Sequence, residues 1–259
     1  MVLATLPACS GGSSDPPTAP PTATSITINL RDVVLAGISV VATATAALSN
    51  GQTQAITTGW RSDAPAVATI TDAGNLTPLA NGEVTITVTA LGTQATKRIR
   101  VAPNYDGRWQ GVQVVAACNA TGIFAGFCED NAEVIGASFP ISLTARHPGE
   151  LAVSGEFNIE DLAFPTFSTQ VESDGRIRFS SVATFDEIRA DVSWNITASE
   201  VGRASGTIRE RYSAAALVGA GEVVIDSNLA AFVRSGADAD RSISSGSRGM
   251  RLRAFLGKR

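Results

Sequence analysis

Residues that could carry out reaction chemistry are few in this chain. The only histidine, His147, lies in a His-Pro-Gly turn, so Ser-His-Asp catalysis, Cys-His catalysis and multi-histidine metal sites all lack their central residue. Neighbouring acids such as Glu129 and Asp130 are typical of solvated turns, and the sequence holds no calcium loop of the Asp-x-Asp-x-Asp-Gly type. We therefore predict a protein that is not an enzyme and uses no metal or cofactor. A carbohydrate-active hydrolase is the alternative, since the fold sets the distance between two carboxylates.

The three cysteines are the other reactive side chains. Cys9 follows Leu6-Pro7-Ala8, and this segment resembles a bacterial lipoprotein signal. The resemblance implies cleavage before Cys9 and lipidation of its sulfur. Cys118 and Cys128 are then left to pair as a disulfide, which is permitted outside the cytoplasm. Closing so short a loop would stabilise the fold by roughly 2–3 kcal/mol.

The segment after Cys9 predicts a tether. Residues 10–22 are rich in serine, glycine and proline and contain almost nothing that could enter a core. A lipidated cysteine followed by such a spacer would hold a folded part off the headgroups. We take residues 1–24 as signal remnant and tether, and predict a lipid-anchored protein of the bacterial cell envelope, at the outer membrane.

Residues 25–102 predict a first domain made of short strands. Apolar residues alternate with Thr and Ser in Ser25–Leu30 and in Ser39–Leu48, and Asn50-Gly51 is typical of a hairpin turn. The ordered signals that follow are Trp60-Arg61-Ser62-Asp63, Pro65-Ala66-Val67-Ala68-Thr69-Ile70, Gly74-Asn75-Leu76 and Asn81-Gly82-Glu83-Val84-Thr85-Ile86.

This string of signals resembles the bacterial immunoglobulin-like domain of group 2. The resemblance implies a seven-stranded β-sandwich, used as a spacer or adhesive module on bacterial surfaces and free of catalytic residues. Its partner would be a cell-surface polysaccharide or protein. We predict that Trp60 fills the core between the two sheets; a carbohydrate-stacking platform is the alternative for this side chain.

Residues 104–235 predict a second all-β domain, an antiparallel β-barrel or β-sandwich. The clearest alternation runs from Ile188 to Thr197, and His147-Pro148-Gly149 and Ser173-Asp174-Gly175 are typical of turns between strands. A closed barrel would leave no long strand edges exposed. The other predicted strands are residues 141–146, 151–159, 176–181, 203–212, 221–226 and 229–233.

Gly107-Arg108-Trp109 at the start of this domain is weakly similar to the start of lipocalin-type barrels. The likeness implies that an arginine of the last strand covers Trp109, and Arg209 and Arg211 are the candidates. It also implies a small apolar ligand inside the barrel. Trp109, Phe124 and Phe127 would contact that ligand if the loop between Cys118 and Cys128 is a lid. A loop that folds inward as a plug, with Trp109 an ordinary core residue, is the preferred alternative.

Charge and hydropathy exclude other classes of protein. The net charge is −4, so no overall basic field favours nucleic acid. The hydrophobic content is 44%, yet no apolar run reaches the ~20 residues of a membrane-spanning helix. Residues 236–259 predict a loosely ordered, basic tail, because this segment contains arginine and lysine but no acidic residue after Asp240.

These features together predict a monomeric, non-enzymatic envelope lipoprotein. In it, the immunoglobulin-like module presents the C-terminal β domain for adhesion or binding. The first alternative is a carrier of a small apolar ligand, and the second is the hydrolase.

Overall fold

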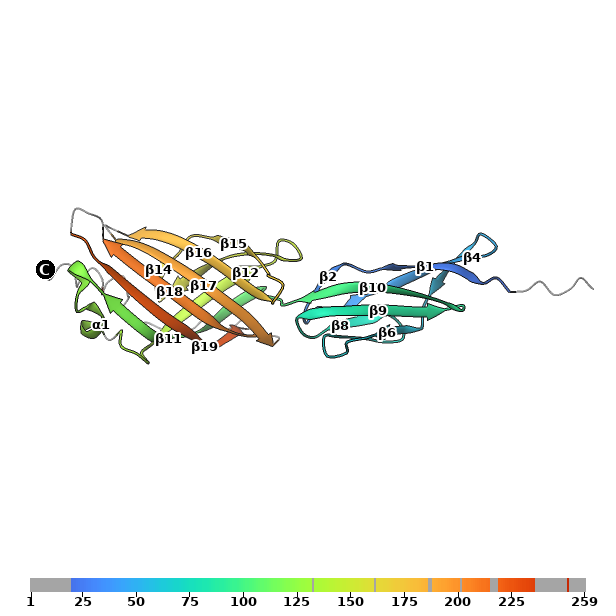
Figure 1. The fold of residues 1–259 in the computed structure, drawn as a ribbon, viewed down its shortest axis with the longest axis horizontal. Helices are drawn as coiled ribbons and strands as arrows, with labels where there is room; N and C mark the ends of the chain where they lie inside the picture. Colours follow the sequence, from blue (N-terminus) through green and yellow to red (C-terminus); the bar gives the residue numbers. More distant parts are fainter. Residues whose placement is uncertain are drawn as a thin grey trace, which may run out of the picture.

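The computed structural model describes residues 20–131, 133–160, 162–185, 188–200, 202–214, 219–235 and 251. Strands make up most of them, in agreement with the predicted all-β fold class. Figure 1 shows two strand-built units joined end to end along the longest axis of the molecule. Strand β1 begins at the outer end of the first unit, far from the second. No helix in these ranges is both long and apolar enough to cross a membrane.

The N-terminal unit is built from three small sheets. One has the order β1-β4-β5, the second β2-β10-β9-β6 and the third β3-β8-β7, and β2 runs parallel to β10. The strands are β1 Ala23–Asn29, β2 Val33–Leu35, β3 Val40–Val41, β4 Thr43–Leu48, β5 Thr53–Ile56, β6 Trp60–Ser62, β7 Ala68–Ile70, β8 Asn75–Pro78, β9 Gly82–Ala90 and β10 Thr93–Ala102.

The predicted strand from Ser39 to Leu48 is two strands in the structure. β3 pairs with β8, whereas β4 pairs with β1 and β5, so the chain changes sheets at Ala42. The Ala42 N–H donates to Gly74 O over 2.9 Å instead of continuing either ladder. Alternation alone did not reveal this break, because the side chains keep a period of two on both sides of it.

Trp60 fills the core of the N-terminal unit, which confirms the prediction for this residue. Its side chain is 3% exposed and lies among buried residues of both faces. Gly74 (φ +84°) makes room for it, because a Cβ at this position would lie 2.6 Å from Ala42 O and 3.2 Å from Trp60 Nε1. The turn before Asn75 therefore has two separate reasons to require glycine.

The C-terminal unit is one antiparallel sheet of nine strands in the order β14-β13-β12-β11-β19-β18-β17-β16, with β15 also paired to β13. The strands are β11 Gly107–Ala120, β12 Ser138–Arg146, β13 Ala152–Ile159, β14 Leu162–Ala163, β15 Phe167–Gln170, β16 Arg176–Phe185, β17 Ile188–Glu200, β18 Arg203–Ala214 and β19 Glu222–Ser235. A 3₁₀ turn, Gly122–Phe124, and a short helix, α1 (Phe127–Asp130), lie between β11 and β12.

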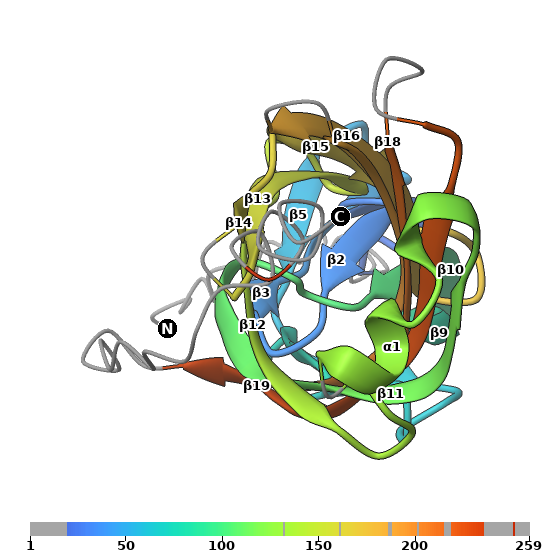
Figure 2. The same ribbon diagram turned by 90° about the vertical axis from the view of Figure 1, so that its left-hand side faces the viewer.

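This sheet curls until its two edges approach each other, as the end-on view in Figure 2 shows. The Thr169 hydroxyl on β15 donates to Arg178 O on β16 over 2.6 Å, which links the edges. We call this unit the curled sheet. Gly155 permits close packing on one side of it, because a Cβ there would lie 2.0 Å from Thr144 O.

The predicted strands 221–226 and 229–233 are one continuous strand, β19. Its ladder to β11 shifts register between the pairs Gln110–Val233 and Val112–Ala230, and Ala231 has φ +49°. A bulge of this kind inverts the alternation, so that Phe232 is buried where an unbroken period would bury a neighbour. The predicted split, between residues 226 and 229, lies before this bulge, where burial still alternates.

Candidate functional site

Trp109 lies inside the curled sheet, at the end nearer to the N-terminal unit. It is 1% exposed, its Nε1 donates to Tyr105 O over 2.7 Å, and it stacks on Phe232 at a centroid distance of 5.9 Å. The guanidinium carbon of Arg234 lies 5.0 Å above the ring. An arginine of the last strand therefore does cover Trp109, in a cation–π contact.

The predicted identity of this arginine was wrong. Arg209 and Arg211 project from the outer face of β18, where they pair with Asp226 at 3.3 Å and Glu222 at 2.6 Å. Arg234 was missed because the last strand was taken to end at Val233, and because the bulge at Ala231 changes which residues of β19 face inward. Burial lowers the pKa of Arg234.

Aromatic rings occupy the interior next to Trp109. Phe167 and Phe179 stack at a centroid distance of 3.8 Å, and Phe157 packs on Phe164 at 4.7 Å and edge-on against Trp194 at 5.0 Å. All five side chains are at most 8% exposed. Side chains of the sheet itself therefore pack this level of the interior.

Cys118 and Cys128 form a disulfide between β11 and α1, with a Cα–Cα distance of 6.0 Å. Phe124 and Phe127, on either side of Gly126, are fully buried and belong to the core of the curled sheet. Figure 2 shows the segment with α1 lying across the end of the sheet. The loop therefore folds inward, and its two rings contact core side chains. Whether Trp109, Phe124 or Phe127 touches a ligand stays a prediction.

The interior also contains polar side chains that strand alternation alone did not identify. Gln113 on β11 is fully buried, and neither amide atom has a hydrogen-bond partner; the same holds for the Ser227 hydroxyl on β19 and for Trp194 Nε1 on β17. Ser227 pairs across the ladder with Val115, two residues from Gln113 on the same face, so these two side chains are diagonal neighbours. On β18, the Tyr212 hydroxyl donates to the buried Glu210 carboxylate.

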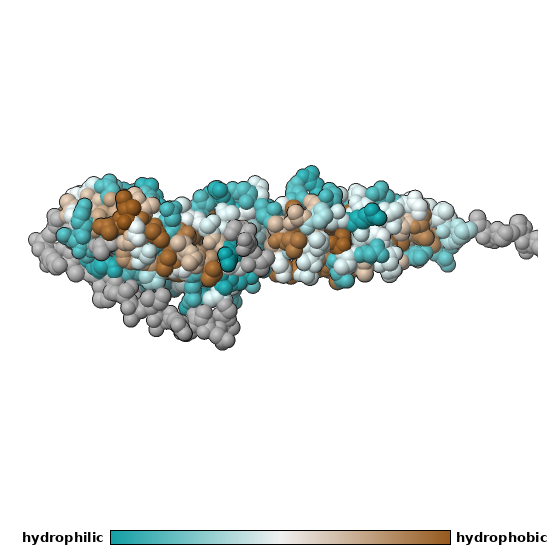
Figure 3. All heavy atoms as spheres, turned by 90° about the horizontal axis from the view of Figure 1, so that it is seen from below, coloured by the Kyte–Doolittle hydropathy of each residue, from teal (hydrophilic) through white to brown (hydrophobic). Residues whose placement is uncertain are grey.

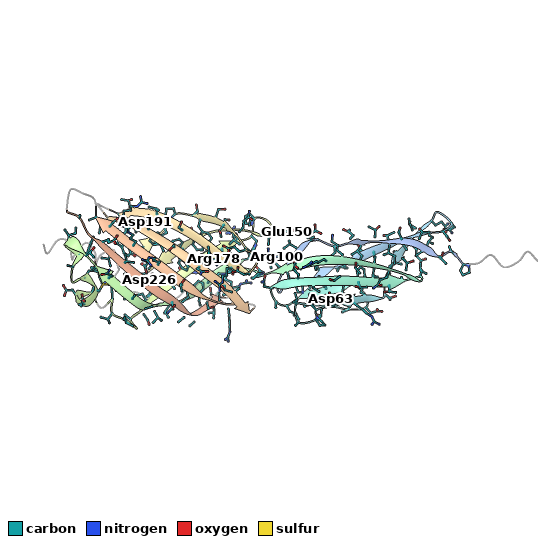
Figure 4. The ribbon with its side chains drawn as sticks, in the orientation of Figure 1. Asp63, Arg100, Glu150, Arg178, Asp191 and Asp226 are labelled. Carbon is teal, nitrogen blue, oxygen red and sulfur yellow. A yellow bond between two sulfur atoms is a disulfide. The ribbon has the colours of Figure 1, made fainter. Side chains whose placement is uncertain are left out.

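A groove of about 690 Å³ crosses four strands of the curled sheet. In the ladders, Arg178 and Ser180 on β16 oppose Asn195 and Ser193 on β17, and Thr207 on β18 opposes Asn228 on β19. Figure 4 shows Arg178 and Asp226 on separate strands of this face. The Glu172 side chain, by hydrogen bonding, raises the pKa of Arg178. The groove therefore offers hydroxyl, amide and charged groups within one surface.

The junction between the two units centres on Tyr105. Its hydroxyl donates to Gly175 O (2.7 Å) and more distantly to Ile196 O (3.2 Å), and it accepts a hydrogen bond from the Ala198 N–H (3.0 Å). The Tyr105 N–H donates to His147 Nε2 over 3.0 Å. Burial raises the pKa of Tyr105 to about 12.

Two arginines make further contacts at the junction, and the Arg100 contact joins the two units directly. Arg100 at the end of β10 donates to Glu172 O, in the turn before β16, and Arg234 donates to Asn104 O in the connecting segment. One arginine from each unit therefore donates to a backbone oxygen at the connection, Arg100 from the Ig-like domain and Arg234 from the curled sheet.

Catalytic and metal-binding arrangements do not emerge from the side chains that the structure describes. His147 accepts a hydrogen bond from the backbone, and its pKa is lowered, mainly by burial. No group of three or more His, Cys, Asp or Glu side chains suited to a metal ion occurs within the described ranges. Cys9 lies outside these ranges, as does the tail apart from Arg251.

Comparison with known proteins gives one informative match. No curated protein matches the sequence. Among solved structures, domains 4–9 of the surface layer protein SbsC align at 13% identity and a TM-score of 0.30, over 80% of this chain and 31% of that one. Domains 5–6 of the same protein align at 16% identity and a TM-score of 0.27, over 80% and 98%. This chain thus spans about a third of the first of these structures. The family of bacterial Ig-like domains (group 2) matches residues 22–101, so the N-terminal unit is an Ig-like domain of this family.

Proposed function

We propose that this chain is a non-enzymatic protein of the bacterial cell envelope, in which the Ig-like domain is a spacer that presents the curled sheet for adhesion or binding. The observation that carries the proposal is the end-to-end arrangement of the two units. The chain enters the Ig-like domain at the end remote from the curled sheet, as Figure 1 shows. A lipid on Cys9 would thus place the curled sheet at the outer end of the molecule.

The hydrogen bonds at the junction support this role, because a spacer must keep a fixed orientation to the domain that it presents. Arg100 of the Ig-like domain donates to Glu172 O of the curled sheet, and Tyr105 fixes the connecting segment to that sheet. Four hydrogen bonds of 2.7–3.2 Å involve the Tyr105 hydroxyl and N–H. Buried hydrogen bonds to backbone groups are costly to break, since the freed groups lose their partners without gaining water. A flexible hinge would instead consist of exposed, weakly bonded residues.

The groove across β16–β19 is the surface that we assign to the partner, a cell-surface polysaccharide. Saccharides carry many hydroxyl groups that both donate and accept hydrogen bonds, and the groove presents groups of both kinds on Ser193, Asn195, Thr207 and Asn228. In the view of Figure 3, apolar and polar residues are interspersed on the surface of both units.

The anchor is tested in cells that produce the full chain. Metabolic labelling with an alkyne fatty acid should label the wild-type protein and leave Cys9→Ser unlabelled, with the variant released into the soluble fraction. A mature protein that keeps an unmodified Met1 in mass spectrometry would exclude the anchor, while leaving the presentation role open to the next test.

The binding role is tested with polysaccharide purified from the envelope of the producing organism. The double variant Asn195→Ala/Thr207→Val should weaken retention on an immobilised sample of this polysaccharide at least tenfold. Thr24→Val is the matched control, because Thr24 has an exposed hydroxyl in the Ig-like domain, which donates to Ala47 O. Equal retention of both variants would reject the groove as the binding surface.

A ligand carrier is the second candidate, favoured by the unpaired atoms of Gln113, Ser227 and Trp194 in the interior. Unpaired buried polar atoms cost about 1–3 kcal/mol each, and an internal hydrogen-bonding molecule, or water, would satisfy them. Such a ligand would be amphipathic, because the core of the curled sheet is rich in aromatic residues. Native mass spectrometry of chain isolated without denaturant should show an added mass, and Gln113→Leu should reduce it; a bare chain mass in both would reject the carrier.

A further inference from the structure

Arg251 lies against the end of the curled sheet that is remote from the Ig-like domain. Its Nη2 donates to Glu160 Oε1 (2.7 Å) and to Glu133 Oε1 (3.0 Å), and its Nη1 donates to Glu160 Oε2 (3.1 Å). The guanidinium carbon also lies 5.1 Å above the Phe139 ring. One arginine thus makes a forked contact with one carboxylate, a single contact with a second, and a cation–π contact.

The groups around Arg251 are fixed by the fold. The Glu160 N–H donates to Pro140 O over 3.0 Å, at the point where β13 leaves its ladder with β12. The Glu133 N–H donates to Cys128 O over 3.0 Å, so this residue is tied to the disulfide-bonded segment. Phe139 belongs to β12. The backbone of each residue in this site is therefore tied to the sheet or to the α1 segment.

The two carboxylates of this site are buried, and this favours a bound cation. The Glu133 and Glu160 side chains are 0% and 2% exposed, whereas that of Arg251 is 22% exposed. Two buried carboxylates are strongly destabilising unless a cation pairs with them. The planar guanidinium suits the forked contact and the aromatic face together, which the compact ammonium of lysine does not.

The position of Arg251 in the chain adds to the argument. β19 ends at Ser235, whose pairing partner is Arg108 at the junction end of β11. Glu133 and Glu160 lie at the opposite end, where β12 begins and β13 ends. Figure 1 shows α1, beside this site, at the end of the molecule farthest from the Ig-like domain. Arg251 therefore lies at the far end of the curled sheet, although β19 ends at the junction end.

We propose that Glu133, Glu160 and Phe139 form an arginine-binding site that the chain fills in cis with its own Arg251. The ligand class is a guanidinium cation on an alkyl stem. Docking of Arg251 fixes this residue at the outer end of the curled sheet. When Arg251 is removed, the site accepts a guanidinium compound from solution.

Chemical rescue in the full chain tests this site. Arg251→Ala should lower the midpoint of thermal unfolding by about 5–10 °C, because it leaves two buried carboxylates without this cation. Ethylguanidinium at 10 mM should restore at least half of that loss, while ethylammonium at the same ionic strength should not. Arg209→Ala is the matched control: Arg209 is also an ion-paired arginine, but it is 62% exposed. This control should show neither the loss nor the rescue.

Binding measurements separate a filled site from an empty one. Titration calorimetry should detect ethylguanidinium binding to Arg251→Ala, at least tenfold weaker binding to wild type, and no binding to Arg251→Ala/Glu160→Gln. Arg251→Lys keeps the charge without the fork, so it should keep the fold if the alanine variant is too unstable, and it should be rescued in part. Equal effects of ethylguanidinium and ethylammonium, or equal binding to wild type and Arg251→Ala, would overturn the proposal.

Discussion

Single residues decide how the two units are joined. Tyr105 is fully buried at the junction, and its hydroxyl serves backbone groups that are 70–93 residues away in the chain. His147 accepts the Tyr105 N–H and stacks on the tyrosine ring at a centroid distance of 6.5 Å. The only histidine of the chain therefore has a structural role at this junction.

Tyr105→Phe should lower the free energy of unfolding of the curled sheet by about 1–3 kcal/mol. The ring still fills its space, but the Ala198 N–H and the Gly175 carbonyl lose their partner in a buried place. Urea unfolding followed by tryptophan fluorescence measures the change. Thr24→Val, which also removes one hydroxyl bond but at an exposed position, should change stability by less than about 0.5 kcal/mol. Equal effects of the two substitutions would contradict the role given to Tyr105.

Protonation of His147 should weaken the folded state in acid. Burial lowers the pKa of His147 below its ordinary value of 6.5. The charge of Arg234 lowers this pKa further, and the charge of Asp106 raises it. The unfolded chain then binds the proton at a higher pH than the folded chain, so stability falls as the pH drops below 6.5 towards the folded pKa. His147→Gln can still accept the Tyr105 N–H and does not titrate. The wild-type minus variant difference in unfolding free energy should therefore decline over this window, and a flat difference would refute the argument.

At the scale of elements, turns and the disulfide-bonded segment set the shape of each unit. The turn at Gly74 brings β8 back beside β7 and leaves room for Trp60. The Cys118–Cys128 bond holds α1 against β11, which keeps Phe124 and Phe127 in the core. Both features connect a local backbone constraint to the packing of a large aromatic side chain.

Gly74→Ala should destabilise the Ig-like domain far more than Gly51→Ala. Both glycines have a positive φ, of +84° and +82°, so alanine is strained at either position by about 1 kcal/mol. At Gly51 nothing lies within 4 Å of an added Cβ, whereas at Gly74 Ala42 O lies at 2.6 Å. We expect a loss of about 1 kcal/mol for Gly51→Ala and at least 2 kcal/mol more for Gly74→Ala, measured by denaturant unfolding. Similar losses at both positions would show that the close contact relaxes without cost.

Cys118→Ser/Cys128→Ser should lower the unfolding free energy by roughly 2–3 kcal/mol, as expected for a short closed loop. Reduction of the wild-type protein should give the same loss, and the double variant should not respond to the reductant. Increased binding of an apolar dye would indicate that Phe124 and Phe127 leave the core. An unchanged midpoint after complete reduction would mean that packing alone holds the segment.

At the scale of the whole molecule, the two units should scatter as one rigid rod. Arg100, Tyr105 and Arg234 all bond to the backbone across or within the connecting segment. Insertion of four Gly and Ser residues between Ala102 and Pro103 should leave both units folded but shorten the mean extension in small-angle X-ray scattering. Identical scattering profiles would mean that the wild-type junction is already flexible.

The sequence by itself determined the strand content, the Ig-like domain, the burial of Trp60 and the pairing of Cys118 with Cys128. The first three follow from period-two alternation, from turn residues and from a family pattern, all of which are local in the chain. The disulfide follows from the two cysteines that are left once Cys9 is assigned to the lipid. The lipid anchor at Cys9 stays a prediction from sequence.

Only the tertiary structure decided the contacts between distant segments. The bulge at Ala231 brings Arg234 over Trp109, the change of sheet at Ala42 divides one predicted strand, and the docking of Arg251 joins Glu133 to Glu160. Local alternation could not reveal these arrangements. At Ala42 the alternation continues unbroken across the change of sheet, and the residues around Arg251 are far apart in the chain. At Ala231 a one-residue shift in register moves the following side chains to the other face of the sheet. Such shifts are fixed by packing across the sheet, which single-strand patterns do not record.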